Sequence, residues 1–255
     1  LWGVAIVKSW IAEYVHGWQG KINLALKESS EALQIAEESG DIYSKAYGYG
    51  FHGYSCYCKG YLREAEEYIV KGIDFFERIN DPGVQGVGHF YLGEIYLNMG
   101  KHVQAREAFE RAISPLEQHR IHSSFLKLGR LAMALSKILG GDLDVELEPL
   151  YSYQAANKIK GLEGCMRRYL SAILLNVDVK RLPEAEDWIG KAIEADTGNG
   201  TRFPLAQDFA HYSELCKRKG DLTMAKEKLS KAIEIFKECG ADGWVNRYEE
   251  ELAKM

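Results

Sequence analysis

Three glycines in the first third of the sequence have a spacing that could bind a phosphate. Gly48, Gly50 and Gly53 form a G-x-G-x-x-G pattern, which in dinucleotide-binding proteins lets a pyrophosphate approach the start of a helix. That loop must follow a β-strand, and no strand-like run precedes Gly48. Gly48 and Gly53 recur 40 residues later as Gly88 and Gly93. We therefore interpret these glycines as positions where helices approach closely.

The thiol and imidazole groups give no metal-binding pattern. Cys56 and Cys58 lack the C-x-x-C spacing of zinc and redox sites, and residues two apart diverge on a helix. His119 and His122 could share a helical face, but a predicted turn falls between them. No Ser–His–Asp order, Walker loop or H-E-x-x-H motif occurs. We expect a non-enzymatic protein with no catalytic residues, no metal and no cofactor.

Composition narrows the possible partners and location. The 37 acidic and 32 basic residues give a net charge of −5, whereas nucleic-acid-binding domains usually carry a basic surplus. No apolar run approaches the roughly 18 residues of a membrane-spanning helix, so we expect neither nucleic acid nor membrane as a partner. Five scattered cysteines favour the reducing cytoplasm. A start at Leu1, with no Met and no charged leader, favours a fragment of a larger protein.

An internal repeat of 40 residues decides the predicted fold. One column is almost entirely alanine: Ala25, Ala65, Ala105, Val145, Ala185 and Ala225. Seven residues later every member is small: Ala32, Gly72, Ala112, Ser152, Ala192 and Ala232. Five residues before the alanines the column is mostly glycine: Gly20, Gly60, Gly100, Gly140, Lys180 and Gly220. Glycine after a periodic run is typical of a helix C-terminus, and small residues let two helices approach closely.

The pattern predicts two helices in each unit, with units at about 1–40, 41–80, 81–120, 121–160, 161–200 and 201–240. A capping helix is expected over 241–255, because an open-ended solenoid must cover its last apolar face. Asp81 followed by Pro82 predicts a helix start. Unit four is irregular: Pro149 falls where a helix interior is expected, so its second helix should start late, near Glu148, after a longer loop at 140–144.

The run Tyr91-Leu-Gly-Glu-Ile-Tyr96, followed by Gly100, Ala105, Phe109 and Ala112, resembles a tetratricopeptide repeat. The usual period is about 34, and 40 resembles longer-helix variants in large signalling regulators. The tail at 232–252 is similar to the ends of bacterial multidomain proteins in which a nucleotide cyclase and an AAA-type ATPase precede tandem repeats. The resemblance implies one all-α, right-handed solenoid of six tetratricopeptide-like repeats with a capping helix, spanning 1–255.

Tetratricopeptide solenoids curve so that their first helices line a concave groove, and this implies a binding surface. The first-helix residues expected to face inward are Trp10, Tyr14, Tyr47, Tyr54, Tyr57, Phe90, Lys127, Arg130, Lys137 and Arg167. Aromatic rings bury large areas at low entropic cost, and arginine grips carboxylates. An acidic–hydrophobic peptide would suit this groove. The alternative is that some of the aromatic residues simply pack between long helices.

Four functions are compatible with these sequence features. The first is a non-catalytic interaction module or scaffold that binds a protein or peptide segment in its groove. The second is a regulatory domain that senses a ligand or peptide and controls an attached cyclase, ATPase or transcription-factor domain, which could itself be an intramolecular partner. An enzyme is the third. The fourth is self-association through the first unit, where Trp2, Trp10 and Trp18 could form an interface.

Overall fold

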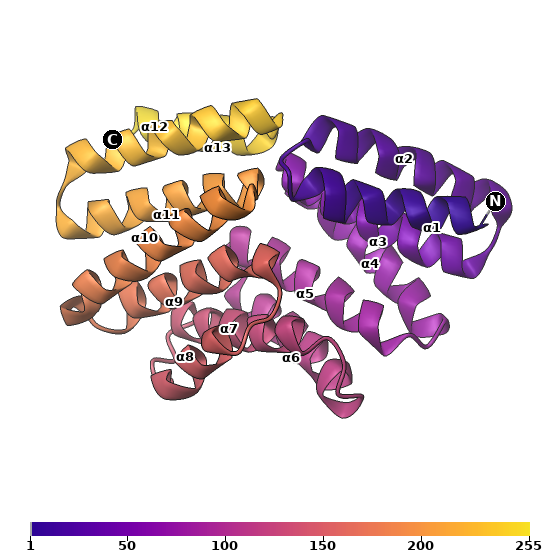
Figure 1. Cartoon of the computed structure of the whole chain (residues 1–255), viewed down its shortest axis with the longest axis horizontal. Helices are drawn as coiled ribbons and strands as arrows, with labels where there is room; N and C mark the ends of the chain where they lie inside the picture. The colour runs from indigo at the N-terminus through magenta and orange to yellow at the C-terminus, as the bar shows by residue number, and fades with distance from the viewer. Residues whose placement is uncertain (1) are drawn as a thin grey trace.

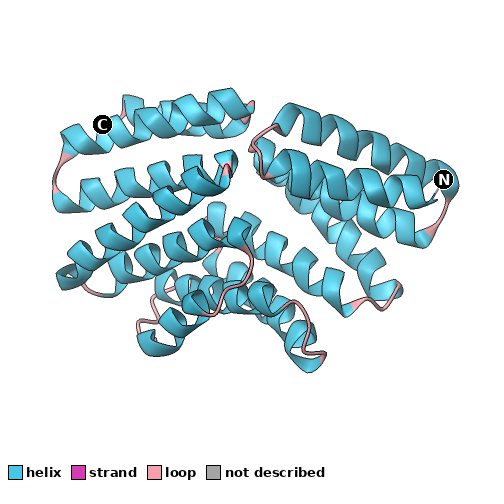
Figure 2. Ribbon diagram, in the orientation of Figure 1, coloured by secondary structure: helices cyan, strands magenta, loops and turns pink. Residues whose placement is uncertain are grey.

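The computed structural model describes residues 2–255, and this part of the chain is helical without any β-strand (Figure 2). The α-helices are α1 (Trp2–Trp10), α2 (Ile22–Ser39), α3 (Ile42–Lys59), α4 (Leu62–Arg78), α5 (Pro82–Asn98), α6 (His102–Gln118), α7 (Ser123–Leu139), α8 (Leu147–Ala155), α9 (Glu163–Val177), α10 (Leu182–Asn199), α11 (Arg202–Lys219), α12 (Leu222–Cys239) and α13 (Asp242–Ala253). A π-helical segment, η1 (Ile11–Gly17), extends α1, and short 3₁₀ turns, η2 (Lys160–Leu162) and η3 (Val179–Arg181), flank α9. The predicted all-α solenoid is confirmed.

Consecutive helices form hairpins that stack side by side, and the repeat columns explain the packing inside each hairpin. The five alanines of the first column are buried, with exposed fractions of 0–1%. Their small side chains let the second helix of a hairpin lie close to the first. The glycine column ends the first helices: Gly60 has φ +91° after α3, a left-handed conformation that glycine adopts without strain.

The G-x-G-x-x-G pattern lies in the middle of α3, where it packs against α4. A Cβ atom on Gly50 would lie 2.7 Å from the ring of Phe76, and one on Gly53 would lie 2.8 Å from the backbone nitrogen of Ile69. Neither glycine is at the start of a helix, where a phosphate would bind. The interpretation as close-packing positions is confirmed.

The helix starts follow the predicted signals, including those of the irregular unit four. Asp81 caps α5 by accepting from the backbone nitrogens of Gly83 (2.9 Å) and Val84 (3.3 Å), with Pro82 in the first turn. The second helix of unit four, α8, begins at Leu147 after a loop, so Pro149 lies in its first turn. Proline is tolerated there because the first backbone N–H groups of a helix have no intrahelical acceptor.

The solenoid bends back on itself, so that its two ends meet. In Figure 1 the chain descends from α1–α4 at the upper right through α5–α8 at the bottom, and returns to α12 and α13 at the upper left. The capping helix α13 contacts α3 directly. The backbone nitrogen of Arg202, at the start of α11, donates to the carbonyl of Trp18 (3.1 Å). The structure is therefore a closed ring of hairpins.

We call the junction between the two ends the seam, and Lys59, Gly60, Asp242, Gly243 and Trp244 form its centre. A Cβ atom on Gly60 would lie 2.5 Å from the backbone nitrogen of Trp244, and one on Gly243 would lie 2.7 Å from the carbonyl group of Gly60. The indole nitrogen of Trp244 donates to the Tyr57 carbonyl (2.9 Å). The ammonium of Lys59 is buried, and it donates to the Gly240 carbonyl (2.6 Å) and pairs with Asp242 (2.5 Å). Backbone therefore lies against backbone, and the buried charge of Lys59 is neutralised.

We predict that Gly243→Ala destabilises the seam. The added methyl group meets the backbone of Gly60, which cannot move like a flexible side chain, so the free energy of unfolding should fall by about 1–3 kcal/mol. Gly190→Ala is the matched control, since nothing lies within 4 Å of its Cβ position in α10, and alanine there should stabilise by up to about 1 kcal/mol. Thermal denaturation and small-angle scattering measure both effects. An unchanged melting temperature and radius of gyration for Gly243→Ala would contradict the close contact.

Candidate functional site

Two connected hollows lie inside the ring, between the first helices of the hairpins. The larger, which we call the central cavity, has a volume of about 280 Å³ and is walled by α5, α7, α9, α11 and α13. The smaller, which we call the aromatic pocket, has a volume of about 60 Å³ and is lined mainly by rings, including those of Tyr54, Tyr57, Phe90, Phe125 and Phe203. Ligand sites in proteins start at about 300 Å³, so together the hollows can hold a small ligand or part of a peptide.

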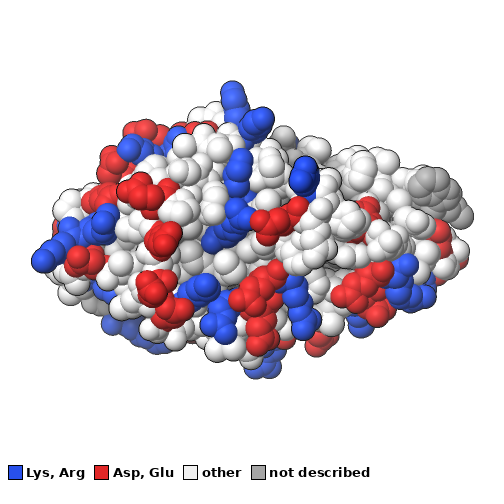
Figure 3. Space-filling view, turned by 90° about the horizontal axis from the view of Figure 1, so that it is seen from below, with Lys and Arg blue, Asp and Glu red and all other residues white. Residues whose placement is uncertain are grey.

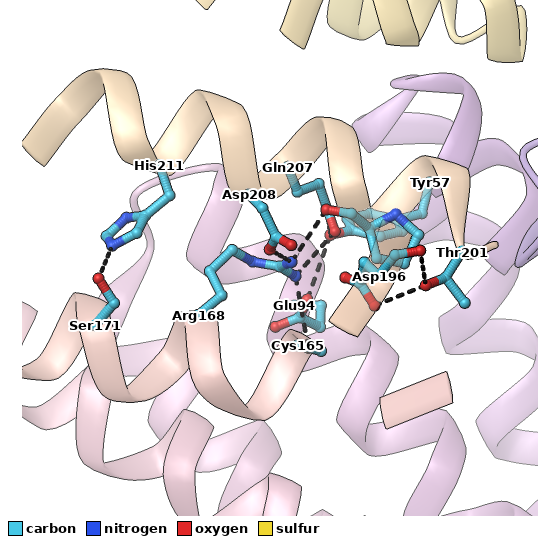
Figure 4. A network of polar contacts seen from close by, with 11 residues as sticks. Tyr57, Glu94, Cys165, Arg168, Ser171, Asp196, Thr201, Gln207, Asp208 and His211 are labelled. Atoms are coloured by element: carbon cyan, nitrogen blue, oxygen red, sulfur yellow. Dashed lines mark hydrogen bonds and ion pairs between the residues drawn. The ribbon is translucent and has the colours of Figure 1, made fainter. Parts of the chain in front are cut away.

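Glu94, Arg168 and Gln207 line both hollows, and we call this group the neck. Figure 4 shows how the neck connects α3, α5, α9 and α11. The Arg168 guanidinium donates to Gln207 Oε1 (3.0 Å), and the Gln207 amide donates to the Tyr57 hydroxyl (3.0 Å). Tyr57 in turn donates to Glu94 Oε2 (3.3 Å), while Tyr169 donates to the other carboxylate oxygen. A chain of polar contacts therefore crosses the ring from one half to the other.

The guanidinium group of Arg168 forms an ion pair with Asp208, which is outside the neck. Its Nη1 lies 2.6 Å from Oδ1 of Asp208, whose side chain is fully buried. Burial raises the pKa of Asp208 well above its usual value, Arg168 opposes that rise, and the charge of neighbouring Asp196 adds to it. Asp196 accepts from the Thr201 hydroxyl (2.6 Å). Arg168 therefore connects α9 to α11 through Asp208 and also contributes to the neck.

Glu94, unlike Asp208, has no cationic side chain of the described residues in direct contact. Burial raises its pKa to about 7, although the nearby charge of Arg168 and the hydrogen bond from Tyr57 both lower it. Its side-chain hydrogen-bond partners are phenols, and no cation lies within 4 Å of it among residues 2–255. Glu94 is therefore a carboxyl group that is only partly ionised at neutral pH and that faces both hollows.

A second buried acid, Glu13, lies in the π-helical segment beside the aromatic pocket. It is fully buried, and Tyr91, which lines the pocket, donates a hydrogen bond to Oε1. Oε2 has no hydrogen-bond partner. Burial raises the pKa of Glu13 to about 8, and the hydrogen bond from Tyr91 opposes the rise. Glu13 is thus protonated at neutral pH, and its neutral form fits the apolar surroundings.

Near the neck, Ser171 and His211 are in hydrogen-bond contact, but the Ser171 hydroxyl donates its proton to the Ala185 carbonyl (2.7 Å) and so cannot also donate it to His211. Burial raises the pKa of the Cys165 thiol, which lines the aromatic pocket, to about 12, so it is not a thiolate at neutral pH. Burial lowers the pKa of His211 to about 4, and its Nε2 lies 2.9 Å from the Ser171 hydroxyl (Figure 4). Within residues 2–255, no group of three or more His, Cys, Asp or Glu side chains is placed to hold a metal ion.

The aromatic residues predicted to face the groove are divided between two places. Tyr54, Tyr57 and Phe90 are brought together in the aromatic pocket. Trp10, Tyr14 and Tyr47 instead line a separate hollow of about 300 Å³ near the N-terminal end of the ring. Trp10 is 47% and Tyr14 39% exposed, whereas Tyr47 is buried and stacks on Phe51. Contact of either group with a partner stays a prediction.

The basic residues predicted to line the groove lie outside the central cavity. Arg130 and Lys137 line a hollow of about 240 Å³ between α7 and α8, where Arg130 also pairs with Glu117. Lys127 donates to the carbonyl of Ala156, just after α8 (3.0 Å). Arg167 donates to the Lys191 carbonyl of α10 (2.8 Å) and pairs with Glu163. Their role as partner contacts stays a prediction.

Sequence reasoning missed three of the residues that organise the interior, Arg168, Glu13 and Asp208. Arg168 is one position beyond Arg167, which is about 100° around a helix, and it lies in the neck where Arg167 does not. Glu13 and Asp208 were not singled out because isolated acids in a charged sequence are usually solvated. One signal was available: Asp208 is followed by Phe209 and Ala210 in a stretch of low charge, Phe203 to His211.

Acidic and basic side chains are interspersed on the face seen in Figure 3. Within residues 2–255, no helix has both the length and the apolar character needed to cross a lipid bilayer.

Comparison with known proteins identifies the fold. A family model described as a tetratricopeptide repeat matches residues 87–114, within α5 and α6. The apo form of RapI superposes with a TM-score of 0.67 at 12% identity, covering 90% of this chain and 83% of RapI. NprR in complex with its cognate peptide NprX superposes with a TM-score of 0.70 at 12% identity, covering 98% of this chain and 73% of NprR. The fold is that of a tetratricopeptide-repeat solenoid.

A third similar structure is longer than this chain. It is PH0952 from Pyrococcus horikoshii, a signal transduction ATPase with numerous domains and a tetratricopeptide repeat sensor. The TM-score is 0.53 at 16% identity, and the match covers 98% of this chain but only 39% of PH0952. No curated protein sequence matches this chain. The solenoid is therefore assigned by the repeat match and by structure.

The buried acid of the π-helical segment leads to a pH-dependent prediction. Because the folded chain keeps the Glu13 proton up to about pH 8 and the unfolded chain loses it near the ordinary pKa of 4.5, the free energy of unfolding should fall as pH rises between these values. The slope is up to about 1.4 kcal/mol per pH unit for one proton. Glu13→Gln should reduce this slope. The range between pH 7 and 8 shows the effect best, because it lies above the pKa of about 7 for Glu94, whose own titration then contributes less to the slope.

Urea denaturation at pH 5, 6, 7 and 8 measures the slope. Glu250→Gln, at an exposed position on α13, is the control and should keep the wild-type slope. A Glu13→Gln slope equal to that of the wild type would show that Glu13 is ionised in the folded chain.

Proposed function

We propose that this protein is a non-catalytic interaction module that binds a peptide segment inside the ring, in the central cavity and aromatic pocket. The observation that carries the proposal is the position of these hollows: they are formed by first helices from both halves of the chain, and so by the concave face of the solenoid. Such a face provides an extended concave binding surface. Aromatic side chains with a few placed polar groups are typical of ligand sites.

The similar structures support a peptide as the ligand class. NprR, with a matching fold over 98% of this chain, was solved with its cognate peptide. We further propose a cytoplasmic location, since all five cysteines are unpaired. For an acidic–hydrophobic partner, we propose that the acidic group binds at Arg130 and Lys137, whose hollow also contains Asp144 and Glu146.

A regulatory sensor is the second candidate, and the seam favours it. A ring that is closed by contacts between distant segments can respond to a ligand by opening or tightening. PH0952 combines a tetratricopeptide repeat sensor with an ATPase. On this proposal the present chain would transmit ligand binding to an attached domain. Small-angle scattering of the wild type with and without a bound peptide tests it, and no change in dimensions would argue for a passive scaffold.

Filling the central cavity should abolish peptide binding. Ala210 lies on its wall and is 8% exposed, so Ala210→Phe places a ring in the cavity without adding charge. Ala155→Phe, at an exposed position at the end of α8, is the matched control. Each variant, confirmed as folded by circular dichroism, is used to select binders from a randomised hexapeptide library. We expect the wild type and Ala155→Phe to enrich the same peptides and Ala210→Phe to lose them.

Two results would contradict the proposal. Equal enrichment by Ala210→Phe would place the binding surface outside the ring. No enrichment by the folded wild type would argue against peptide binding altogether.

A further inference from the structure

The walls of the central cavity carry three carboxyl groups, and two of them already have cationic partners. Glu214 accepts an ion pair from Lys217 (2.7 Å) and another from Arg218 (3.1 Å). Glu251 pairs with the same Lys217 (2.6 Å). The third carboxyl group, Glu94, has phenol hydroxyls as partners. It is therefore the acid on the wall whose charge no side chain of the described chain balances by direct contact.

The nearby cations cannot turn to Glu94 without losing existing contacts. Arg168 is held by Asp208 (2.6 Å) and by Gln207 (3.0 Å), and it also donates to the Pro204 carbonyl (3.3 Å). Arg247, at the rim, donates to the Asn98 carbonyl (3.0 Å) and lies over the Trp244 ring, with 5.4 Å between the guanidinium carbon and the ring centroid. Both guanidinium groups are thus already used for packing around the cavity. A further positive charge beside Glu94 would have to come from a ligand.

The surroundings of Glu94 also suit a cation. The hydroxyl groups of Tyr57 and Tyr169 both donate hydrogen bonds to its carboxylate. Their aromatic rings therefore lie close to the carboxylate, and the faces of aromatic rings attract cations when water is excluded. The aromatic pocket begins on the other side of the neck, so a ligand can place an apolar group there while its charged group stays beside Glu94. This combination selects a ligand with an apolar group close to a positive charge.

We propose that Glu94 is the specificity-determining residue of the site, and that it pairs with a cationic group, an ammonium or a guanidinium, on a ligand whose neighbouring apolar group fills the aromatic pocket. The inference rests on the proposed peptide-binding function and deepens it. In a peptide the cation is either a lysine or arginine side chain or the free amino terminus. A cation that pairs with a buried carboxylate gains a charge-assisted hydrogen bond.

Binding of the cation draws Glu94 into its ionised form, so affinity should depend on pH. The titratable and charged groups that face Glu94 from the surrounding helices are Tyr57 of α3, Cys165, Arg168 and Tyr169 of α9, His211 and Glu214 of α11, and Arg247, Tyr248 and Glu251 of α13. Burial raises the pKa values of Tyr57 and Cys165 and lowers that of His211, so these three stay neutral between pH 6 and 8. With a pKa of about 7 for Glu94, affinity for a lysine or arginine side chain should rise about tenfold from pH 6 to pH 8. The rise should be smaller for a free amino terminus, which itself loses its proton near pH 8.

The test is selection from two randomised hexapeptide libraries, one with free and one with acetylated amino termini. The baits are the wild type, Glu94→Gln and, as the matched control, Glu250→Gln, at an exposed position on α13 that lines neither hollow. We expect the wild type and the control to enrich peptides with an apolar residue next to a positive charge. Glu94→Gln should bind these peptides about 10- to 100-fold more weakly, and calorimetry should show that its affinity no longer changes between pH 6 and 8.

The libraries separate the two sources of the cation. Lysine or arginine enrichment from both libraries identifies a side chain, and enrichment from the free-terminus library alone identifies the amino terminus. Enrichment of acidic peptides, enrichment of uncharged peptides from the acetylated library, or equal binding by Glu94→Gln would overturn this inference and leave peptide binding in place. No enrichment by the wild type would overturn both.

Discussion

The contact between the two ends of the solenoid determines the shape of the space inside the ring. Gly60 and Gly243 let the end of α3 and the start of α13 meet backbone to backbone, and the indole of Trp244 then reaches the Tyr57 carbonyl. Tyr57 is also a member of the polar chain that crosses the interior. Closure therefore fixes one wall of both hollows. In an open solenoid the same first helices would present a shallow groove to solvent.

The repeat made the fold predictable, because each hairpin is specified locally. The columns of small residues and of glycine predicted the helix pairs, and Pro149 correctly indicated that the second helix of unit four starts late. Closure could not be predicted, since it joins residues such as Tyr57 and Trp244, which are 187 positions apart. A small change in the rotation between successive repeats would separate them, and no motif encodes that rotation.

The interior site was predictable only in part, for reasons of geometry. Tyr54, Tyr57 and Phe90 were identified because aromatic residues on first helices tend to face the concave side. Lys127, Arg130 and Lys137 were expected there too, but the short, late-starting α8 leaves space beside α7 that these long side chains occupy. Whether Arg167 or Arg168 faces the interior depends on how the helix is rotated about its own axis. Neighbouring residues point about 100° apart on a helix, and a sequence pattern does not define the rotation that closely.

Closure of the ring also constrains the number of repeats, which can vary in most solenoids. Open repeat arrays lengthen or shorten by duplication or loss of units, because each unit contacts only its neighbours. Here six hairpins and one capping helix bring α13 to α3. A seventh hairpin would carry α13 past its partner, and a missing one would leave it short. Gain or loss of a unit would therefore separate α13 from α3, whereas a substitution within a unit leaves the number of units, and with it this contact, in place.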